Sequence, residues 1–450
     1  GHVGGTGASP QTSIKYAGIP WEMGLAEAHQ TLMLNNLRHR VRLRTDGGIR
    51  TGRDVVVAAI LGAEEFGIGT ASLVALGCLM VRQCHSNTCP VGVCVQDEEL
   101  RKKFTGTPEK VVNLMSFVAE EVREILSLIG FTRLEDVIGR TDLIEQISRG
   151  AEHLDDLDLN PLLVRVDSPY PPFCAEKSRN EPPPSLDHEM LANAQGFFER
   201  GEKRQLDFAV RNTQRAIGAR ASAHVVRKFG MKGLREGQLN VNLRGSCGQS
   251  LGAFMVQGIA LDVTGDANDY VGKGLSGGLI TLRPPPNEPA GAIIGNTCLY
   301  GATSGKLFAA GLAGERFAVR NSGASAVIEG AGTNACEYMT GGVVVILGEV
   351  GDNFGAGMSG GMAFVYDADE RFEAMANPDS IVWQRIASKH WEGVLKALVQ
   401  EHADRTGSPV AQAQLKNWNA ARGRFWQICP KEMIPRLANA LTDPEAVAAE

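Results

Sequence analysis

This 450-residue sequence lacks long apolar runs and an excess of positive charge. No segment approaches the roughly 18 apolar residues that a membrane-spanning helix needs, so we expect no membrane span. Lys and Arg total 45 against 51 Asp and Glu, for a net charge of −6, which excludes a nucleic-acid-binding protein that relies on bulk positive charge. The apolar fraction of 43% is ordinary for a globular protein, and the length allows two to four domains.

The chain also lacks an initiator methionine and a basic-then-apolar leader. It opens with the polar glycine loop GHVGGTGASP, which indicates an interior start in a longer polypeptide. Of its nine cysteines, four lie within 17 residues: Cys78, Cys84, Cys89 and Cys94. An odd total with one tight cluster, in a large chain without a secretion signal, favours metal ligation over a disulfide framework. We therefore expect a reducing, cytoplasmic location.

Residues 1–100 alternate between strand and helix patterns. A short strand is predicted over 41–45, and Thr51-Gly52-Arg53-Asp54 forms a capping box before the apolar run 55–61. A second strand, 64–68, leads through Gly69 and Thr70 into a helix predicted over 71–81. Successive strand and helix units predict parallel strands, in an open doubly wound sheet or a (β/α)8 barrel. Two units are too few to decide between them.

A long amphipathic helix is predicted to begin at Thr107 and Pro108 and to end at Gly130. Farther on, the stretch 154–186 is rich in proline and predicts an extended linker at a domain boundary.

Glycines dominate residues 245–361 and follow a period. Gly323, Gly342 and Gly361 are each 19 residues apart, and each opens a short β run. Roughly 20 residues form one turn of a parallel β-helix with glycines at its corners, so we predict a right-handed parallel β-helix. Helical patterns over 381–402 and 412–426 predict a cap over its end.

Two segments, 272–277 and 355–360, satisfy the Gly-x-Gly-x-x-Gly dinucleotide fingerprint. That fingerprint needs a helix after it, so that the pyrophosphate meets a helix N-terminus. Because a β run follows each copy, we interpret both as structural corners.

Better candidates for binding a phosphate are Asp46-Gly47-Gly48 and Gly69-Thr70, because each lies at the end of a strand and opens a helix. Two capped helices with tight turns are the alternative interpretation. Arg42 and Arg44 are unusual in a strand that should be buried on both faces; they either reach an anion or form salt bridges.

Cys78, Cys84 and Cys89, followed by Pro90, present three thiolates within twelve residues. A [3Fe–4S] centre needs three thiolates and a [4Fe–4S] cube normally takes four, with Cys94 as a possible fourth ligand. Zinc bound with His85, and unligated thiols, are the alternatives. If the helix over 71–81 starts at Thr70, Cys78 lies about 12 Å along it, which predicts a rigid spacer between a phosphate site and a cluster.

The segments RTDGGIRTGRDV, FGIGTASL and GCLMVRQCHSNTCPVGVCVQD, with the opening loop and the glycine repeats, resemble the C-terminal part of the glutamate synthase large subunit. The resemblance implies an oxidoreductase of ammonia assimilation that forms two glutamates from glutamine and 2-oxoglutarate. It implies FMN in a (β/α)8 barrel and a [3Fe–4S] cluster that relays electrons. It also implies a hetero-oligomer with a small flavoprotein subunit that carries FAD, [4Fe–4S] clusters and an NADPH site, the NADPH-linked type being favoured over the ferredoxin-linked type.

Carried over by position, Cys78, Cys84 and Cys89 correspond to the cluster ligands, and Cys94 is spare. The FMN region resembles residues 25–82. Its phosphate end is assigned to five residues: Asp46, Gly47, Gly48, Gly69 and Thr70. The residues that bind 2-oxoglutarate and catalyse its reduction are expected upstream.

We therefore expect four regions: the last part of the barrel with the iron–sulfur loop (1–104), a helical and proline-rich linker (105–235), the β-helix (236–367) and a helical cap (368–450). An incomplete barrel cannot close, so this chain alone should not catalyse the reaction. The alternative function is a non-catalytic β-helix scaffold that organises partner proteins. Another FMN-barrel oxidoreductase is disfavoured, because the β-helix would have no explanation.

Overall fold

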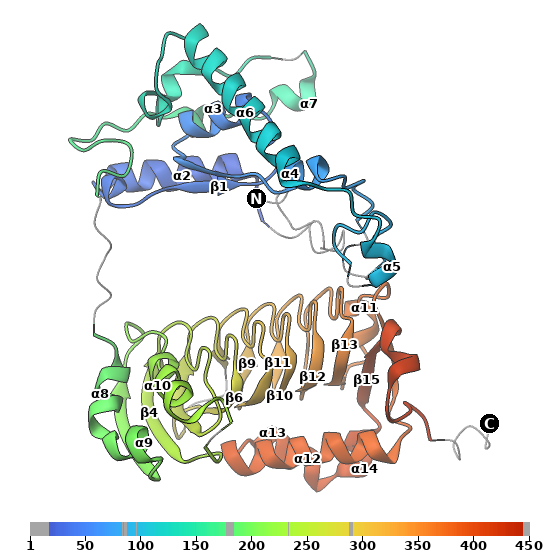
Figure 1. Cartoon of the computed structure of the whole chain (residues 1–450). Coiled ribbons are helices and arrows are strands. Elements are labelled where there is room, and N and C mark those ends of the chain that lie inside the picture. The colour runs from blue at the N-terminus through green and yellow to red at the C-terminus, as the bar shows by residue number, and fades with distance from the viewer. Residues whose placement is uncertain are drawn as a thin grey trace. The chain divides into compact units, whose positions relative to one another are not determined.

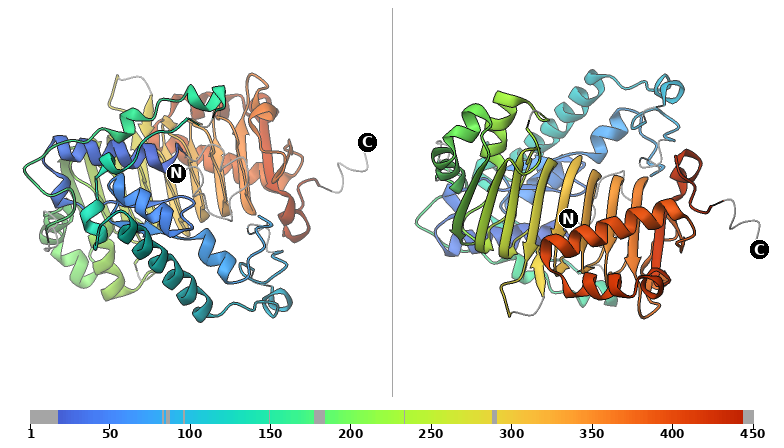
Figure 2. Two further views of the ribbon diagram at one scale, coloured as in Figure 1. Left: turned by 90° about the horizontal axis from the view of Figure 1, so that it is seen from above. Right: turned by 90° about the horizontal axis from the view of Figure 1, so that it is seen from below.

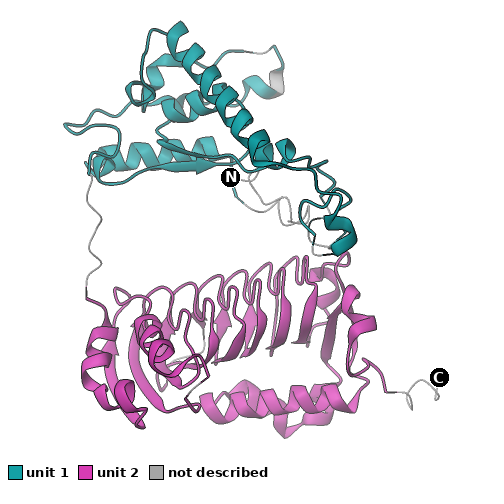
Figure 3. Cartoon of the chain, in the orientation of Figure 1, with its two compact units in different colours: residues 1–181 teal, residues 182–450 magenta. Residues whose placement is uncertain are grey.

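The computed structural model describes residues 18–82, 84, 88–95, 97–148, 150–176, 184–232, 234–287 and 291–443. The chain forms two compact units, residues 1–181 (unit 1) and residues 182–450 (unit 2) (Figure 3). The division falls inside the proline-rich stretch. Each unit has its own hydrophobic core. Among the described residues, no helix is both long and apolar enough to cross a bilayer.

Unit 1 is a mixed α/β unit around two short parallel strands (Figure 1). Strand β1 (Arg44–Asp46) pairs in parallel with β2 (Glu65–Gly67), and helix α3 (Gly52–Ile60) connects them. The predicted capping box is confirmed, because Thr51 and Asp54 each accept the other's backbone N–H. The other helices of the unit are α2 (Trp21–Leu34), η2 (Arg38–Arg40), α4 (Thr70–Ala75), α5 (Glu98–Arg101), α6 (Pro108–Leu128), η3 (Leu134–Val137), η4 (Thr141–Leu143), α7 (Glu152–Asp155) and η5 (Asn160–Leu163).

Helix α6 matches the long helix predicted from the sequence. It covers Pro108–Leu128 and is followed by Gly130 in a left-handed conformation (φ +82°). Its buried side chains, Val118 and Val122 among them, join α3 in one core cluster. The two helices approach closely at Gly52, where an added Cβ would lie 2.7 Å from the backbone nitrogen of Val122.

A buried polar network joins α2 to the strand region of unit 1. The guanidinium of Arg38 donates from Nε to His29 Nδ1 (3.2 Å) and from Nη2 to Glu64 Oε1 (2.6 Å). The second carboxylate oxygen of Glu64 accepts the backbone N–H of Cys174 (3.0 Å). Burial, and then the positive charge of Arg38, lower the pKa of His29 to about 4. His29 is therefore a neutral hydrogen-bond acceptor at physiological pH.

Unit 2 is built on a 13-stranded, mostly parallel sheet. From β5, one row of neighbours runs through β6, β8, β10, β12 and β13, and a second row runs through β7, β9 and β11. The strands are β3 (Arg204–Val210), β4 (Leu239–Cys247), β5 (Ile259–Ala267), β6 (Ser276–Arg283), β7 (Ala292–Ile294), β8 (Ser304–Ala309), β9 (Leu312–Ala313), β10 (Ser322–Ile328), β11 (Gly330–Ala331), β12 (Thr340–Ile346), β13 (Gly360–Tyr366), β14 (Ile381–Arg385) and β15 (Phe425–Pro430).

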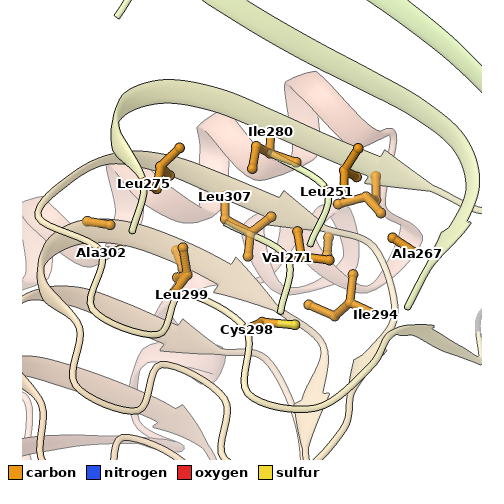
Figure 4. Packing of buried hydrophobic residues seen from close by; sticks show 14 of the residues in the cluster. Leu251, Ala267, Val271, Leu275, Ile280, Ile294, Cys298, Leu299, Ala302 and Leu307 are labelled. Carbon is orange, nitrogen blue, oxygen red and sulfur yellow. The ribbon is translucent and has the colours of Figure 1, made fainter. Parts of the chain in front are cut away.

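The register of the first row reproduces the glycine period. One column of mutually aligned partners is Leu261, Ile280, Leu307, Ala326, Val344 and Ala363. Its members are 19, 27, 19, 18 and 19 residues apart, so a single step is longer than the period. All six side chains are buried in the main core of unit 2. Figure 4 shows Ile280 and Leu307 packed with Leu251 and Val271.

The second row is made of short strands and lines the same core. Its aligned residues are Ala267, Ile294, Ala313 and Ala331, and Ala331 forms a further parallel bridge with Val350. Ala267 and Ile294 lie beside the first-row side chains in Figure 4.

Turns with alternating left-handed residues connect the second row to the first. In successive turns, the residues with positive φ are Ser250, Gly252 and Phe254; Tyr270, Gly272 and Gly274; Thr297, Leu299 and Gly301; Arg316, Ala318 and Arg320; Asn334, Cys336 and Tyr338; and Asn353, Gly355 and Gly357. Neighbouring turns hydrogen-bond to one another, as the N–H of Gly272 does to Leu251 O (2.8 Å). The two Gly-x-Gly segments are thus corners followed by strands, which confirms the rejection of a dinucleotide site.

The outer face of the first row is covered by helices rather than exposed. Phe308, Val327 and Val345 lie in a second core cluster together with residues of α12 (Lys389–Thr406). Helix α12 contacts β6, β8, β10 and β12 and runs across these strands (Figure 2). The sequence predicted a cap over the end instead; the apolar outer face draws the helix onto itself, and antiparallel β15 and β14 continue the sheet beyond β13.

The remaining helices lie on either side of the sheet residues in the sequence. They are α8 (Leu186–Asn193), α9 (Gln195–Arg200), α10 (Ala219–Phe229), α11 (Phe372–Met375), α13 (Pro409–Lys416), α14 (Trp418–Arg422) and η6 (Lys431–Arg436).

Candidate cofactor and cluster site

The two segments predicted to bind a phosphate begin at the same edge of the β1–β2 sheet. Asp46 and Gly67 are register partners, so the loops that follow them start side by side. Gly47 and Gly48 have φ values of +124° and +87°, which L side chains adopt only with strain. The structure therefore brings Asp46-Gly47-Gly48 and Gly69-Thr70 together; their role in binding phosphate stays a prediction.

Carboxylates of the chain itself occupy the N-terminus of α3. The N–H of Gly52 donates to Glu121 Oε2 (2.7 Å), and the N–H groups of Arg50 and Thr51 donate to Asp54 Oδ2 (2.9 and 3.0 Å). Burial raises the pKa of Asp54, but these N–H bonds outweigh it and leave the pKa below its usual value. An anion at this edge would therefore meet the Gly47–Gly48 backbone rather than the start of α3.

Helix α4 is shorter than predicted, and Cys78 does not lie on it. The helix covers Thr70–Ala75 and ends at Gly77, whose φ is +99°. The N–H of Gly77 donates to Val74 O (2.9 Å) and that of Cys78 to Leu73 O (3.0 Å), which is a Schellman ending. The helix predicted over 71–81 and the rigid-spacer hypothesis are therefore wrong, because a glycine at 77 stops the helix.

The three predicted cluster cysteines line one pocket. Its volume is about 520 Å³, which includes solvent at its mouth. The lining residues are Thr70, Leu73, Cys78, Leu79, Met80, Val81, Arg82, Cys84, Cys89, Pro90, Val91 and Cys94. Thr70 also belongs to the second phosphate-candidate segment. Sulfur donors and the end of β2 thus meet in a mostly apolar pocket.

Backbone N–H groups point at two of these sulfurs. The N–H of Met80 donates to Cys78 Sγ (3.4 Å). Burial raises the pKa of Cys89, but N–H bonds from Cys94, Val91 and Val93 lower it to about 7. N–H bonds of this kind stabilise thiolates and tune iron–sulfur clusters. The sequence analysis missed these donors, since backbone direction leaves no signature in residue types.

A tight turn holds Cys89 and Cys94 together. Gly92 has a φ of +75°, and its N–H donates to Cys89 O (3.3 Å). The Cys94 thiol hydrogen-bonds to the sulfurs of Cys84 and Cys89; burial first, and then these contacts, raise its pKa to about 12. Cys94 is therefore part of the cysteine group, a contact that the resemblance did not predict.

The donor set fits a cluster better than a single ion. No three His, Cys, Asp or Glu side chains within the described ranges are gathered closely enough to hold one metal ion. Each ligand of an iron–sulfur cluster binds a different iron, so its sulfurs can stand farther apart. His85, the zinc ligand that the sequence suggested, lies outside the described residues.

Arg42 and Arg44 both contact Glu65 on β2. Arg42 Nη1 lies 3.1 Å from Glu65 Oε1, and Arg44 binds the other carboxylate oxygen. Both arginines are exposed, and the salt-bridge interpretation of the sequence holds for this pair.

Comparison with known proteins places the chain in a family. A family model described as the GXGXG motif matches residues 187–431, more than half of the chain, and the chain belongs to that family. A model described as a conserved region in glutamate synthase matches residues 1–132. Within this family the chain corresponds to the C-terminal region of the glutamate synthase large chain.

The relatives share this similarity along the whole chain. "Glutamate synthase [NADPH] large chain" of Azospirillum brasilense is 64% identical over 455 residues, which is 100% of this chain and 30% of the relative. The protein of the same name from Bacillus subtilis is 45% identical over 99% of this chain and 30% of its own length. "Ferredoxin-dependent glutamate synthase, chloroplastic" of Spinacia oleracea is 45% identical over 96% of this chain. The chain thus spans less than a third of these relatives.

Proposed function

We propose that this chain supplies the flavin and iron–sulfur part of a glutamate synthase, which transfers the amide nitrogen of glutamine to 2-oxoglutarate and yields two glutamates. The observation that carries the proposal is the pocket lined by Cys78, Cys84 and Cys89. It lies where β2 passes through Thr70 into α4, in the region that matches the glutamate synthase model. The names of the relatives support the reaction.

Within this proposal, Cys78, Cys84 and Cys89 hold a [3Fe–4S] cluster. The N–H groups of Met80, Val91, Val93 and Cys94 support the thiolates of Cys78 and Cys89. The backbone of Gly47, Gly48 and Gly69, with Asp46 and Thr70, holds the phosphate end of FMN. When bound, the cluster supplies one-electron transfer and the flavin supplies the hydride. The residues that bind 2-oxoglutarate are proposed to lie in parts of the enzyme outside this chain.

The folds named from the sequence belong to the same proposal. Unit 1 is proposed to be the last part of a (β/α)8 barrel, supported by the parallel β1–α3–β2 connection. Unit 2 is proposed to be a right-handed parallel β-helix, supported by the two aligned rows and the near-constant step between their strands. Right-handed connection is the rule for parallel neighbours in a sheet. The regional boundaries at 104/105, 235/236 and 367/368 are retained as proposals.

The electron donor and partner follow from the relatives. We infer an NADPH-linked enzyme in the cytoplasm with a small flavoprotein subunit that carries FAD and [4Fe–4S] clusters, because the NADPH-type relative from Azospirillum brasilense is 64% identical. Activity with NADPH and the small subunit, and none with reduced ferredoxin, is the expected result.

The experiment is a comparison of serine variants in the full-length protein. Wild type should contain iron and acid-labile sulfide, show the electron paramagnetic resonance of an oxidised [3Fe–4S] centre, and form glutamate from glutamine and 2-oxoglutarate. Cys78→Ser, Cys84→Ser and Cys89→Ser should each lose the signal and the electron transfer, whereas Cys174→Ser, outside the pocket, should retain both. A colourless wild type without iron would favour the scaffold function instead.

A further inference from the structure

We propose that Cys94 is a redox partner of Cys89: in the cluster-free protein their thiols form a reversible disulfide, which withholds one cluster ligand until it is reduced. This inference rests on the proposed cluster site. It gives a role to the cysteine that the resemblance leaves spare.

The local backbone brings the two cysteines together. The turn 89–94 reverses at Gly92 and is closed by the N–H of Gly92 on Cys89 O (3.3 Å). An added Cβ at Gly92 would lie 2.5 Å from Leu100 O, so this turn is packed against the chain that follows it. A disulfide needs Cβ atoms about 3.5–4.5 Å apart. A thiol that already hydrogen-bonds to the other sulfur needs only a small movement to reach that distance.

Cys89 is a better partner for Cys94 than Cys84 is. Both the backbone N–H and the thiol of Cys94 hydrogen-bond to Cys89, whereas Cys84 makes only a side-chain contact with Cys94. Cys94 is exposed and Cys89 is buried. A soluble oxidant therefore reaches Cys94 first, and Cys89 is placed to complete the bond.

The chemistry requires a small disulfide as oxidant, such as glutathione disulfide. The Cys94 sulfur attacks it, forms a mixed disulfide and releases one thiol; the Cys89 sulfur then displaces the second thiol and forms the Cys89–Cys94 bond. Two protein S–H groups are lost, and the two electrons appear as two small thiols. Only Cys78 and Cys84 then remain as ligands, although a [3Fe–4S] centre needs three thiolates. The disulfide and the cluster are therefore mutually exclusive.

The test uses the full-length protein after anaerobic removal of its iron with a chelator. One portion is treated with glutathione disulfide and another with dithiothreitol, and both are mapped by peptide mass spectrometry. The oxidised portion should contain a Cys89–Cys94 link with the loss of two hydrogens. After addition of ferrous iron and sulfide, it should take up less than a tenth of the iron of the reduced portion and recover after dithiothreitol.

Two variants decide the role of Cys94. Cys94→Ser should take up the same iron in both portions, and Cys174→Ser should behave like wild type. The inference is overturned if Cys89 stays free or pairs with Cys84, if oxidation leaves iron uptake unchanged, or if Cys94→Ser fails to bind iron in both portions. If reduced wild type takes up no iron, the proposed cluster function fails, while the peptide masses still decide whether the disulfide forms.

Discussion

Arg38 Nη2 and Glu64 Oε1 form an ion pair of 2.6 Å in which the arginine side chain is 1% exposed and the glutamate side chain 12%. The pair connects the segment after α2 to the residue that precedes β2. Its burial makes it sensitive to the loss of either partner, since a buried charge without a partner is strongly destabilising.

We expect Arg38→Met to lower the free energy of unfolding of unit 1 by about 3–5 kcal/mol, because the charge of Glu64 then remains buried alone. Hydrogen exchange of the α2 and α3 backbone in urea measures the change. The matched control is Arg44→Met, whose side chain is 71% exposed beside Glu65; it should leave exchange unchanged. Equal effects of the two substitutions would contradict the prediction.

The second prediction concerns acid sensitivity at His29. Its pKa is lowered to about 4 in the folded chain, against about 6.5 in the unfolded chain. The unfolded chain therefore binds a proton between these values and the folded chain does not. The resulting stability is fully present above pH 6.5 and is lost as the pH falls to 4.

We expect unit 1 to lose about 3 kcal/mol from this group between pH 6.5 and 4. Hydrogen exchange at α2 across this range measures it. His29→Gln should show a flatter pH dependence, because its amide does not titrate. A wild-type curve as flat as that of the variant would show that His29 titrates normally.

A third prediction separates steric clash from backbone strain in unit 2. Gly265 has φ +144°, and an added Cβ would lie 2.0 Å from Gly245 O in the neighbouring strand. Gly301 has φ +65° but no heavy atom within 4 Å of that position. Gly301→Ala should cost about 1 kcal/mol from strain alone, and Gly265→Ala about 1–3 kcal/mol more. Thermal unfolding of both variants measures the difference, and equal melting temperatures would refute it.

A fourth prediction concerns Asp187, which is fully buried on α8. Its carboxylate accepts the N–H groups of Gly218 (2.8 Å), Arg220 (2.7 Å) and Ala221 (3.0 Å) at the start of α10. Asp187→Asn should destabilise unit 2 by about 2–4 kcal/mol, because it removes the charge and turns an N–H group toward these donors. Chemical denaturation measures this loss. Asp207→Asn, at an exposed carboxylate bonded to Asn242, is the control and should be close to neutral.

Local signals predicted the elements that depend on neighbouring residues. Thr51 and Asp54 marked the start of α3, and Pro108 and Gly130 bounded α6, because capping and helix ending involve residues a few positions apart. The 19-residue glycine period likewise corresponds to the strand spacing in the first row. Such features need no knowledge of the rest of the fold.

Features set by distant contacts were not predictable in this way. The left-handed turn residues Tyr270, Leu299 and Cys336 are not glycines, and their conformation accompanies hydrogen bonds to adjacent turns. Helix α12 was expected at the end of the sheet but covers its outer face. At the candidate site, residue types identified the cysteines, whereas the N–H donors of Val91 and Val93 depend on the path of the backbone.

The stacking of turn upon turn has a consequence for how this domain can change length. Each turn borrows its conformation from its neighbours, so a half-period deletion would align a corner with a strand and break the sequence of contacts. Removal of 19 residues between equivalent points, such as Ser325 to Val343, which are register partners 18 apart in β10 and β12, would need only one residue of adjustment. Growth and shrinkage by whole layers is therefore the path of least disruption for such an architecture, in evolution and in engineering.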